Sequence, residues 1–141
     1  MRAAFFIDTN VLLYRASTDE GERPKRMVAE ALLRRGDIGL SAQVLAEFYH
    51  NATSKRGLRM SAERAAAIVE SLTLLPVIPI TSEIVQTAIR LRQRYQISYW
   101  DGAIIAAAKE LGASTVYSED LAHGQVYDGV TVLNPFLPDV E

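Results

Sequence analysis

The sequence predicts an α/β sandwich, in which helices cover the faces of a parallel β-sheet. Short apolar and β-branched runs, which are typical of buried strands, are separated along the chain by segments with helical spacing of apolar residues. Several of these helical segments begin at a serine and end at a glycine, which are common helix boundaries. The 141 residues contain no internal repeat, linker or low-complexity segment, and we expect residues 1–141 to form a single domain.

The first half of the chain is expected to begin with one buried strand and to continue with helices. Residues 3–7 (AAFFI) are predicted to form the strand, and the next helix begins with Asp8 or Thr9 near its N-cap. A charged loop at 18–24 precedes further helical segments, which are expected at 25–37, within 38–57 where Ser41 is the N-cap, and at 61–73.

The second half is expected to alternate strands with helices. Residues 74–80 (LLPVIPI) are apolar, β-branched and bounded by proline, which favours a strand near a sheet edge. A turn is expected at Asp128-Gly129. The other predicted elements are helices at 81–96 and 97–113, a strand within 114–120 and a last strand at 130–133.

The composition excludes several classes of protein. There is no cysteine, which rules out a disulfide scaffold, and two histidines, His50 and His123, are too few for a typical histidine zinc site. The net charge of −2 argues against a general basic surface for nucleic acid, although an enzyme can still meet phosphate through a bound cation. No apolar run reaches the roughly 20 residues that span a bilayer, and we see no signal peptide. We therefore expect a cytoplasmic protein without a membrane partner.

Three acidic residues stand among large apolar or aromatic neighbours. Asp8 follows Phe-Phe-Ile, Glu47 lies in VLAEFY, and Asp101 lies in SYWDGAII. An acid in such a setting is seldom buried unless it is paired. Ordinary structural explanations stay open at this point: Asp8 as a helix N-cap, Asp101 as an acid in a first helical turn, and Glu47 as one half of an ion pair.

A fourth acid follows the predicted strand within 114–120, where Glu119 and Asp120 stand side by side. Ligands of parallel sheets gather beyond the carboxyl ends of the strands, where Asp8 and Asp120 are expected. Asp101 begins the helix that leads into the later strand, so its spacing alone predicts a place toward the opposite end of the sheet. If the acids nevertheless meet, their repulsion requires a cation, and oxygen ligands favour Mg²⁺ or Mn²⁺. The chemistry that suits such a site is phosphodiester hydrolysis by a metal-activated water.

Four segments of the chain, in order, closely resemble the four motifs of the PIN-domain nucleases, and within that family the VapC-like toxins of bacterial type II toxin–antitoxin pairs. The segments are FIDTNVLLY, SAQVLAEFYHNATSK, ISYWDGAIIAAAKELGA and VYSEDLAHGQ. The resemblance implies a three-layer α/β/α sandwich around a mostly parallel sheet. It further implies a Mg²⁺- or Mn²⁺-dependent endoribonuclease acting on single-stranded RNA, which forms a homodimer and is inhibited by a small antitoxin protein.

The resemblance also assigns roles to individual residues. The family's three core acids are matched by Asp8, Glu47 and Asp101, and its fourth, more variable acid is matched by Asp120. The polar residues that support the acids are matched by Thr9, Asn10 and Ser118. Glu119 adds an acid beside the fourth position. The Asp-Leu step favours Asp120 as the residue that faces the metal, and the choice between the two stays open.

Other signals have both a functional and a structural interpretation. Lys55 and Arg56 could draw RNA phosphate toward the site or could belong to a solvated loop. Tyr99 and Trp100 could stack on a base, but we expect them to pack in the core or at a dimer interface. We expect no metal role for His50, because its Glu-x-x-His motif occurs only once.

Two other functions stay open from the sequence alone. A PIN nuclease could act in RNA processing without being a toxin, and a non-catalytic partner-binding module is possible if the acids do not converge. The RNA that is cleaved, the antitoxin and the number of metal ions are not indicated by any motif.

Overall fold

The computed structural model describes residues 1–138. A six-stranded sheet lies at the centre of this part of the chain. The strands lie in the order β3-β2-β1-β4-β6-β5, and every neighbouring pair is parallel except β5 and β6. Their bounds are β1 Phe5–Ile7, β2 Ile38–Ser41, β3 Val77–Ile78, β4 Thr115–Tyr117, β5 Val126–Tyr127 and β6 Val130–Leu133. The expected mostly parallel sheet is therefore confirmed.

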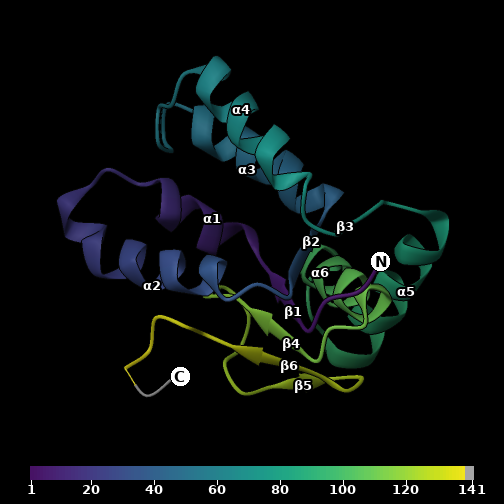
Figure 1. Ribbon diagram of the computed structural model, residues 1–141. Helices are drawn as coiled ribbons and strands as arrows, with labels where there is room; N and C mark the ends of the chain where they lie inside the picture. The colour runs from purple at the N-terminus through teal and green to yellow at the C-terminus, as the bar shows by residue number, and fades with distance from the viewer. Residues whose placement is uncertain (139–141) are drawn as a thin grey trace.

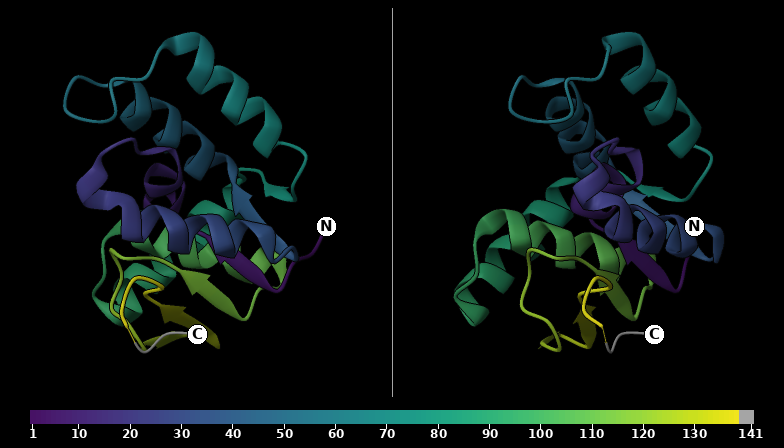
Figure 2. Two further views of the ribbon diagram at one scale, coloured as in Figure 1. Left: turned by 60° about the vertical axis from the view of Figure 1, so that its left-hand side comes forward. Right: turned by 90° about the vertical axis from the view of Figure 1, so that its left-hand side faces the viewer.

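Helices cover both faces of this sheet, as Figures 1 and 2 show. On one face lie α1 (Thr9–Ala16) and α2 (Arg23–Arg34), and on the other lie α5 (Ser82–Tyr95) and α6 (Tyr99–Leu111). A helical pair formed by α3 (Ala42–Thr53) and α4 (Ala62–Leu72) extends past the sheet on the side of α1. These layers confirm the expected α/β/α sandwich.

The order of the strands explains why the helices divide between the two faces. The chain moves from β1 outward through β2 to β3, and then returns to place β4 on the other side of β1. Since crossover connections between parallel strands are right-handed, this reversal puts α5 and α6 on the face opposite α1 and α2. The boundary between β1 and β4 is thus the topological switch point, where ligand sites of open α/β sheets lie.

The central helix α6 is held very close to its neighbours. Its residues from Gly102 to Ala108 are all buried, and a Cβ atom at Gly102 would lie 2.6 Å from the carbonyl oxygen of Ala88 in α5. Such a contact leaves no room for a side chain at Gly102 without a shift of the backbone. The packing of α5 against α6 therefore fixes the first turn of α6, which carries Asp101.

The structure contains three short elements that the sequence analysis does not predict. The strand β2 occupies Ile38–Ser41, β5 occupies Val126–Tyr127, and a 3₁₀-helix forms at Glu20–Glu22 inside the expected loop. Gly39 weakens the strand signal of β2, because glycine is unfavourable in strand interiors. A Cβ atom there would lie 2.7 Å from the side chain of Leu111 and 3.0 Å from the carbonyl oxygen of Pro76, so a larger residue would displace these neighbours.

Most of the other boundaries agree with the prediction. The predicted caps Ser41, Ser61 and Ser98 each accept a hydrogen bond from the first turn of the following helix. The turn at Asp128-Gly129 joins β5 to β6 with positive φ at both residues. Within residues 1–138, no helix has the length and apolar character needed to cross a membrane.

Candidate metal centre

Asp8 occupies the end of β1 and the N-cap of α1 at once. Its side chain accepts hydrogen bonds from the backbone N–H of Thr9 at 2.7 Å, from the hydroxyl of Ser118 at 2.6 Å and from the amide of Asn10 at 3.3 Å. The residue is only 6% exposed. The N-cap interpretation is therefore correct, but a cap alone does not require a second carboxylate oxygen to be bound by Ser118, which lies 110 residues away.

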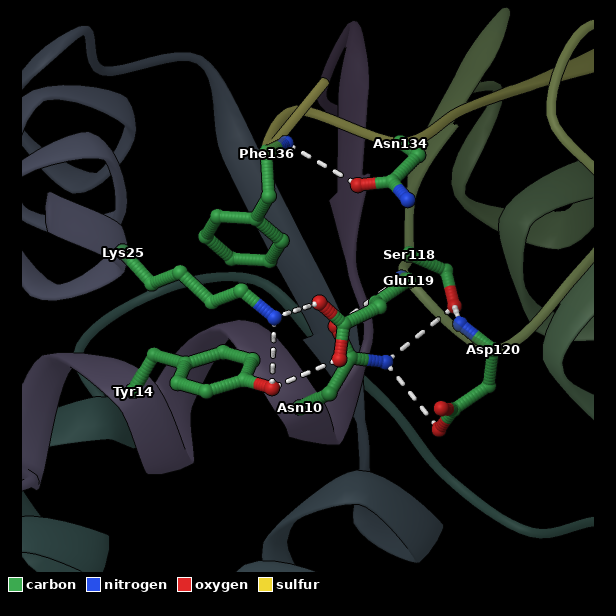
Figure 3. A network of polar contacts seen from close by, with 8 residues as sticks. All are labelled: Asn10, Tyr14, Lys25, Ser118, Glu119, Asp120, Asn134 and Phe136. Carbon is green, nitrogen blue, oxygen red and sulfur yellow. Dashed lines mark hydrogen bonds and ion pairs between the residues drawn. The ribbon is translucent and has the colours of Figure 1, made fainter. Parts of the chain in front are cut away.

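Asn10 joins α1 to the segment that follows β4. Its side-chain amide donates to Ser118 and to Asp120, each at 3.2 Å, and its carbonyl oxygen accepts from the backbone N–H of Glu119 at 3.1 Å. Figure 3 shows these contacts on both sides of the amide. Because the two strands β1 and β4 are neighbours, this bridge holds Asp8 and Asp120 at the same edge of the sheet.

Four acids from four separate segments line one pocket of about 130 Å³ beyond the carboxyl ends of β1 and β4. They are Asp8, Glu47, Asp101 and Asp120. Thr9 and Asn10 also line the pocket, whereas Ser118 lies behind it, fully buried and bonded to Asp8. All seven residues that the resemblance assigns are therefore in the pocket or in contact with an acid that lines it.

Asp101 reaches the pocket because α6 runs antiparallel to β4. The carbonyl oxygen of Leu111, the last residue of α6, accepts a hydrogen bond from Ala3 just before β1. The end of α6 thus lies at the amino ends of the strands, and its first turn lies at their carboxyl ends. The expectation that Asp101 lies toward the opposite end of the sheet is wrong, because a helix that leads into a parallel strand begins at the carboxyl ends of the strands.

Glu47 projects from the second turn of α3, directly beyond β2. Its carboxylate accepts a hydrogen bond from the side chain of Gln43 at 2.9 Å. Within residues 1–138, neither Glu47 nor any of the other three pocket acids takes part in a salt bridge. An ion pair therefore does not account for Glu47 in the described part of the chain, and the pocket keeps its negative charge.

The electrostatics of the pocket disfavour ionisation of its acids. Burial raises the pKa of Asp8 from 3.8 to about 6, with further contributions from the charges of Asp120 and Glu47, although the hydrogen bonds from Ser118 and Thr9 act in the opposite direction. Partial burial also raises the pKa of Asp101, and the nearby Asp120 adds to that shift. A cation in the pocket would remove this repulsion.

Glu119 is directed away from the pocket. Its carboxylate forms an ion pair with Lys25 of α2 and accepts a hydrogen bond from the hydroxyl of Tyr14 at 2.6 Å (Figure 3). Partial burial acts to raise the pKa of Glu119, but the contacts with Lys25 and Tyr14 outweigh it and hold the value below its usual range. The charge of Glu119 is thus balanced by Lys25, whereas Asp120 faces the other three acids.

Two further polar residues line the pocket and were missed in the sequence. Gln43 and Asn51 lie one turn before and one turn after Glu47 on the same face of α3. The spacing 43, 47, 51 is a detectable i, i+4, i+8 pattern. Such polar residues are also typical of an ordinary solvated helix face, so the pattern indicates a site only once the fold places it next to Asp8 and Asp101.

A larger groove of about 650 Å³ shares Asn10, Asn51 and Asp120 with the acid pocket. Arg56 lines this groove, whereas the exposed Lys55 does not. The two histidines lie outside the pocket and the groove, and the ring of His123 accepts a hydrogen bond from the backbone of Asn134. The structure thus brings Arg56, but not Lys55, to the neighbourhood of the acids.

The residues of the pocket fit a hard divalent cation. All four acids offer oxygen, which Mg²⁺ and Mn²⁺ prefer, and the buried hydroxyl of Thr9 has no hydrogen-bond partner within residues 1–138. In the same residues, no group of three or more histidine, aspartate or glutamate side chains is arranged as a ready set of metal ligands. The arrangement suits an ion that keeps part of its water shell, as Mg²⁺ does.

Comparison with known proteins places this geometry in a family. A family model described as PIN domain matches residues 5–128, and no curated protein matches the sequence. The solved structures that resemble the chain include a toxin–antitoxin complex from Klebsiella pneumoniae, with 21% identity over 92% of this chain and 96% of that chain and a TM-score of 0.68. Mycobacterium tuberculosis VapC20, described as a Sarcin-Ricin loop cleaving toxin, shares 19% identity over 82% of this chain and 89% of its own, with a TM-score of 0.64. DNA-bound VapBC from Salmonella typhimurium shares 19% identity over 94% of this chain and 97% of that chain, with a TM-score of 0.64.

The raised pKa of Asp8 predicts how the stability of the metal-free protein depends on pH. Between about pH 4 and pH 6 the folded protein holds a proton on Asp8 that the unfolded chain has released. The contribution of Asp8 to the free energy of unfolding is therefore full below about pH 4 and falls by about 3 kcal/mol as the pH rises through 6. Urea denaturation in the presence of a chelator measures this change.

The Asp8→Asn variant isolates this effect from the other ionisable groups. Asparagine keeps an N-cap acceptor but carries no charge. We expect the variant to gain stability relative to the wild type as the pH rises from about 4 to 6. Parallel stability curves for the two proteins would contradict the assignment of this titration to Asp8.

Proposed function

The chain belongs to the PIN domain family, and we propose that it is a Mg²⁺- or Mn²⁺-dependent endoribonuclease that cleaves single-stranded RNA and acts as the toxin of a toxin–antitoxin pair. The observation that carries this proposal is the meeting of Asp8, Glu47, Asp101 and Asp120 at one pocket. Their charges have no basic partner within residues 1–138. A site of this kind suits a cation and, through the cation, a phosphodiester.

The residues of the pocket have distinct tasks in this proposal. The four acids would hold the cation, which supplies an acidified water as nucleophile and neutralises charge on the phosphate. Ser118 and the backbone N–H of Thr9 fix both oxygens of Asp8. Asn10 contacts Asp8 and Asp120 together, so it sets the distance between two proposed metal ligands. Such supporting hydrogen bonds orient metal ligands and tune their basicity.

The larger groove offers a path for the RNA strand toward the acids. It shares Asp120 with the acid pocket and is also lined by Asp19, Glu22 and Glu119. Arg56 in the same lining has a guanidinium that can pair with a phosphate of the strand. Asn10, Leu13 and Asn51 also line both regions, and the two amide side chains can donate or accept hydrogen bonds. Because the acids of the groove repel phosphate, the contacts that it offers an RNA strand come from Arg56 and the two amides.

The biological role is proposed from the solved relatives. Two of them are described as assemblies of a toxin with its partner, in one case bound to DNA, and VapC20 is described as cleaving the Sarcin-Ricin loop. By analogy we propose that this chain forms a homodimer, is inhibited by a small antitoxin protein and acts in the cytoplasm.

The first prediction of this proposed function concerns the cation and its acids. We expect cleavage of single-stranded RNA to require Mg²⁺ or Mn²⁺, and Asp8→Asn and Asp101→Asn each to lower its rate by at least about 100-fold. Glu110→Gln, which removes an exposed charge from the same helix as Asp101, should cleave like the wild type. Gel assays with and without a chelator measure these rates. Full activity in either aspartate variant would refute the catalytic assignment.

A second prediction separates the neighbouring acids Glu119 and Asp120. Because Asp120 faces the pocket and Glu119 is paired with Lys25, Asp120→Asn should lower the cleavage rate by about tenfold or more. Glu119→Gln should retain a rate within a few-fold of the wild type. The reverse order in the same assay would show that Glu119 supplies the fourth ligand.

A third prediction concerns the toxin role. Induced expression of the wild-type chain should arrest the growth of a bacterial host, whereas expression of Asp8→Asn to the same level should not. Growth curves and immunoblots measure both quantities. An active nuclease that leaves growth unchanged would favour the alternative role in RNA processing.

A further inference from the structure

Trp100 is a large aromatic side chain at the mouth of the acid pocket. It precedes Asp101 in the first turn of α6 and is 64% exposed. The ring of Tyr99 packs edge-on against its ring, with centroids 5.0 Å apart and an interplanar angle of 82°. Tyr99 and Trp100 are expected from the sequence to pack in the core or at a dimer interface. Trp100 does not pack in the core, whereas Tyr99 is half-buried, and a place at a dimer interface stays a prediction. The contact with Tyr99 holds the indole in place while leaving much of it open to solvent.

The same indole also lines a second, apolar groove of about 50 Å³ beside the acid pocket, which is too small to enclose a nucleobase. The walls of this groove come mainly from β3, the segment after it, and the starts of α5 and α6, with Ile78, Ile80 and Ile84 among the lining residues. Gln43 and Trp100 line both the groove and the acid pocket. The side-chain nitrogen of Gln43 donates a hydrogen bond to Glu47, which leaves its carbonyl oxygen available as an acceptor. The groove thus combines an aromatic ring, aliphatic walls and one amide.

We propose that the exposed face of Trp100 at the mouth of this groove is a nucleobase subsite, on which the base next to the reacting phosphate stacks. The inference rests on the proposed function, because that function brings a single-stranded RNA to the acids on the other side of the indole. Bases of single strands are unpaired, and stacking on aromatic side chains is how proteins commonly bind them. A phosphate in the acid pocket and a base stacked on the indole at the edge of the apolar groove would place one nucleotide across Trp100. Gln43 can then contact the edge of that base.

A second copy of the chain is the competing occupant of this groove. Trp100 lines the acid pocket as well as the groove, so a protein seated on the indole would also cover the mouth of the pocket. A nuclease needs that mouth open for its substrate. The shared lining therefore favours a nucleobase as the occupant.

Intrinsic fluorescence tests the proposal directly, because Trp100 is the only tryptophan of the chain. The probes are an eight-nucleotide oligoadenylate and an abasic ribose-phosphate chain of the same length, added in Ca²⁺ buffer with intactness checked on gels. We expect oligoadenylate to quench the emission and the abasic chain to leave it nearly unchanged. Equal responses to both probes, or no response to either from a protein that cleaves RNA, would overturn the subsite.

Substitutions of Trp100 provide a second readout. Trp100→Leu should raise the KM for single-stranded RNA roughly 5- to 150-fold, the range expected for the loss of one stacked base, while Trp100→Phe should recover much of that loss. Leu74→Ala removes another exposed apolar side chain, which lines neither the groove nor the pocket, and should match the wild type. Unchanged KM in Trp100→Leu would overturn the proposal.

The same variants separate the possible causes of failure. If Trp100→Leu changes the oligomeric state in light scattering, the groove is an interface between copies and the subsite is refuted. If the wild type cleaves no RNA with Mg²⁺ or Mn²⁺, the proposed function fails, whatever the fluorescence shows. If it cleaves RNA while the Trp100 variants behave like the wild type, only the subsite fails.

Discussion

A buried carboxylate at the end of β1 is the constraint on which the rest of the site depends. Asp8 is almost inaccessible to solvent, and burial of an ionised group is costly unless polar neighbours compensate for it. The compensation comes from Thr9, which is adjacent in sequence, and from Ser118, which is brought there only because β4 pairs with β1. The compensation is incomplete, since the pKa of Asp8 still rises to about 6. The fold therefore holds Asp8 in a position that favours a bound cation.

The remaining acids follow from the topology around that carboxylate. Glu47 and Asp120 come from segments that follow β2 and β4, whose carboxyl ends meet at the same edge as the end of β1. Asp101 arrives from the start of α6, because the close packing of Gly102 on α5 sets where that turn lies. Charge is distributed selectively as well. Lys25 neutralises Glu119, and the four pocket acids take part in no salt bridge within residues 1–138.

The sequence alone predicts the acids better than their surroundings. Asp8, Glu47 and Asp101 are conspicuous because a charge interrupts an apolar run, and that signal is local. Whether Glu119 or Asp120 faces the pocket depends on Lys25, which lies 94 residues before Glu119 in the chain, so local sequence could not decide it.

Other features were hidden for different physical reasons. Gln43 and Asn51 do not stand out in the sequence, because a polar residue on a helix face is usually solvated and has no energetic penalty. The strand β2 was not predicted because Gly39 weakens the strand signal. The absence of a side chain at Gly39 leaves room for the side chain of Leu111. In both cases the reason for the residue lies in its neighbour and not in its own segment.

On the proposed function, the opposite characters of the two sides of Trp100 imply that binding of the cation and binding of RNA are coupled. Without a cation, the four acids repel a phosphate, and the indole of Trp100 would have to hold a base against that repulsion. With a cation bound, the same pocket attracts the phosphate, and the base and phosphate of one nucleotide can be held together. Coupling of this kind is reciprocal, so RNA must raise the affinity for the cation by the same factor. On the proposed function, an acidic protein of net charge −2 can thus select RNA without the broad basic surface that nucleic-acid-binding proteins commonly use.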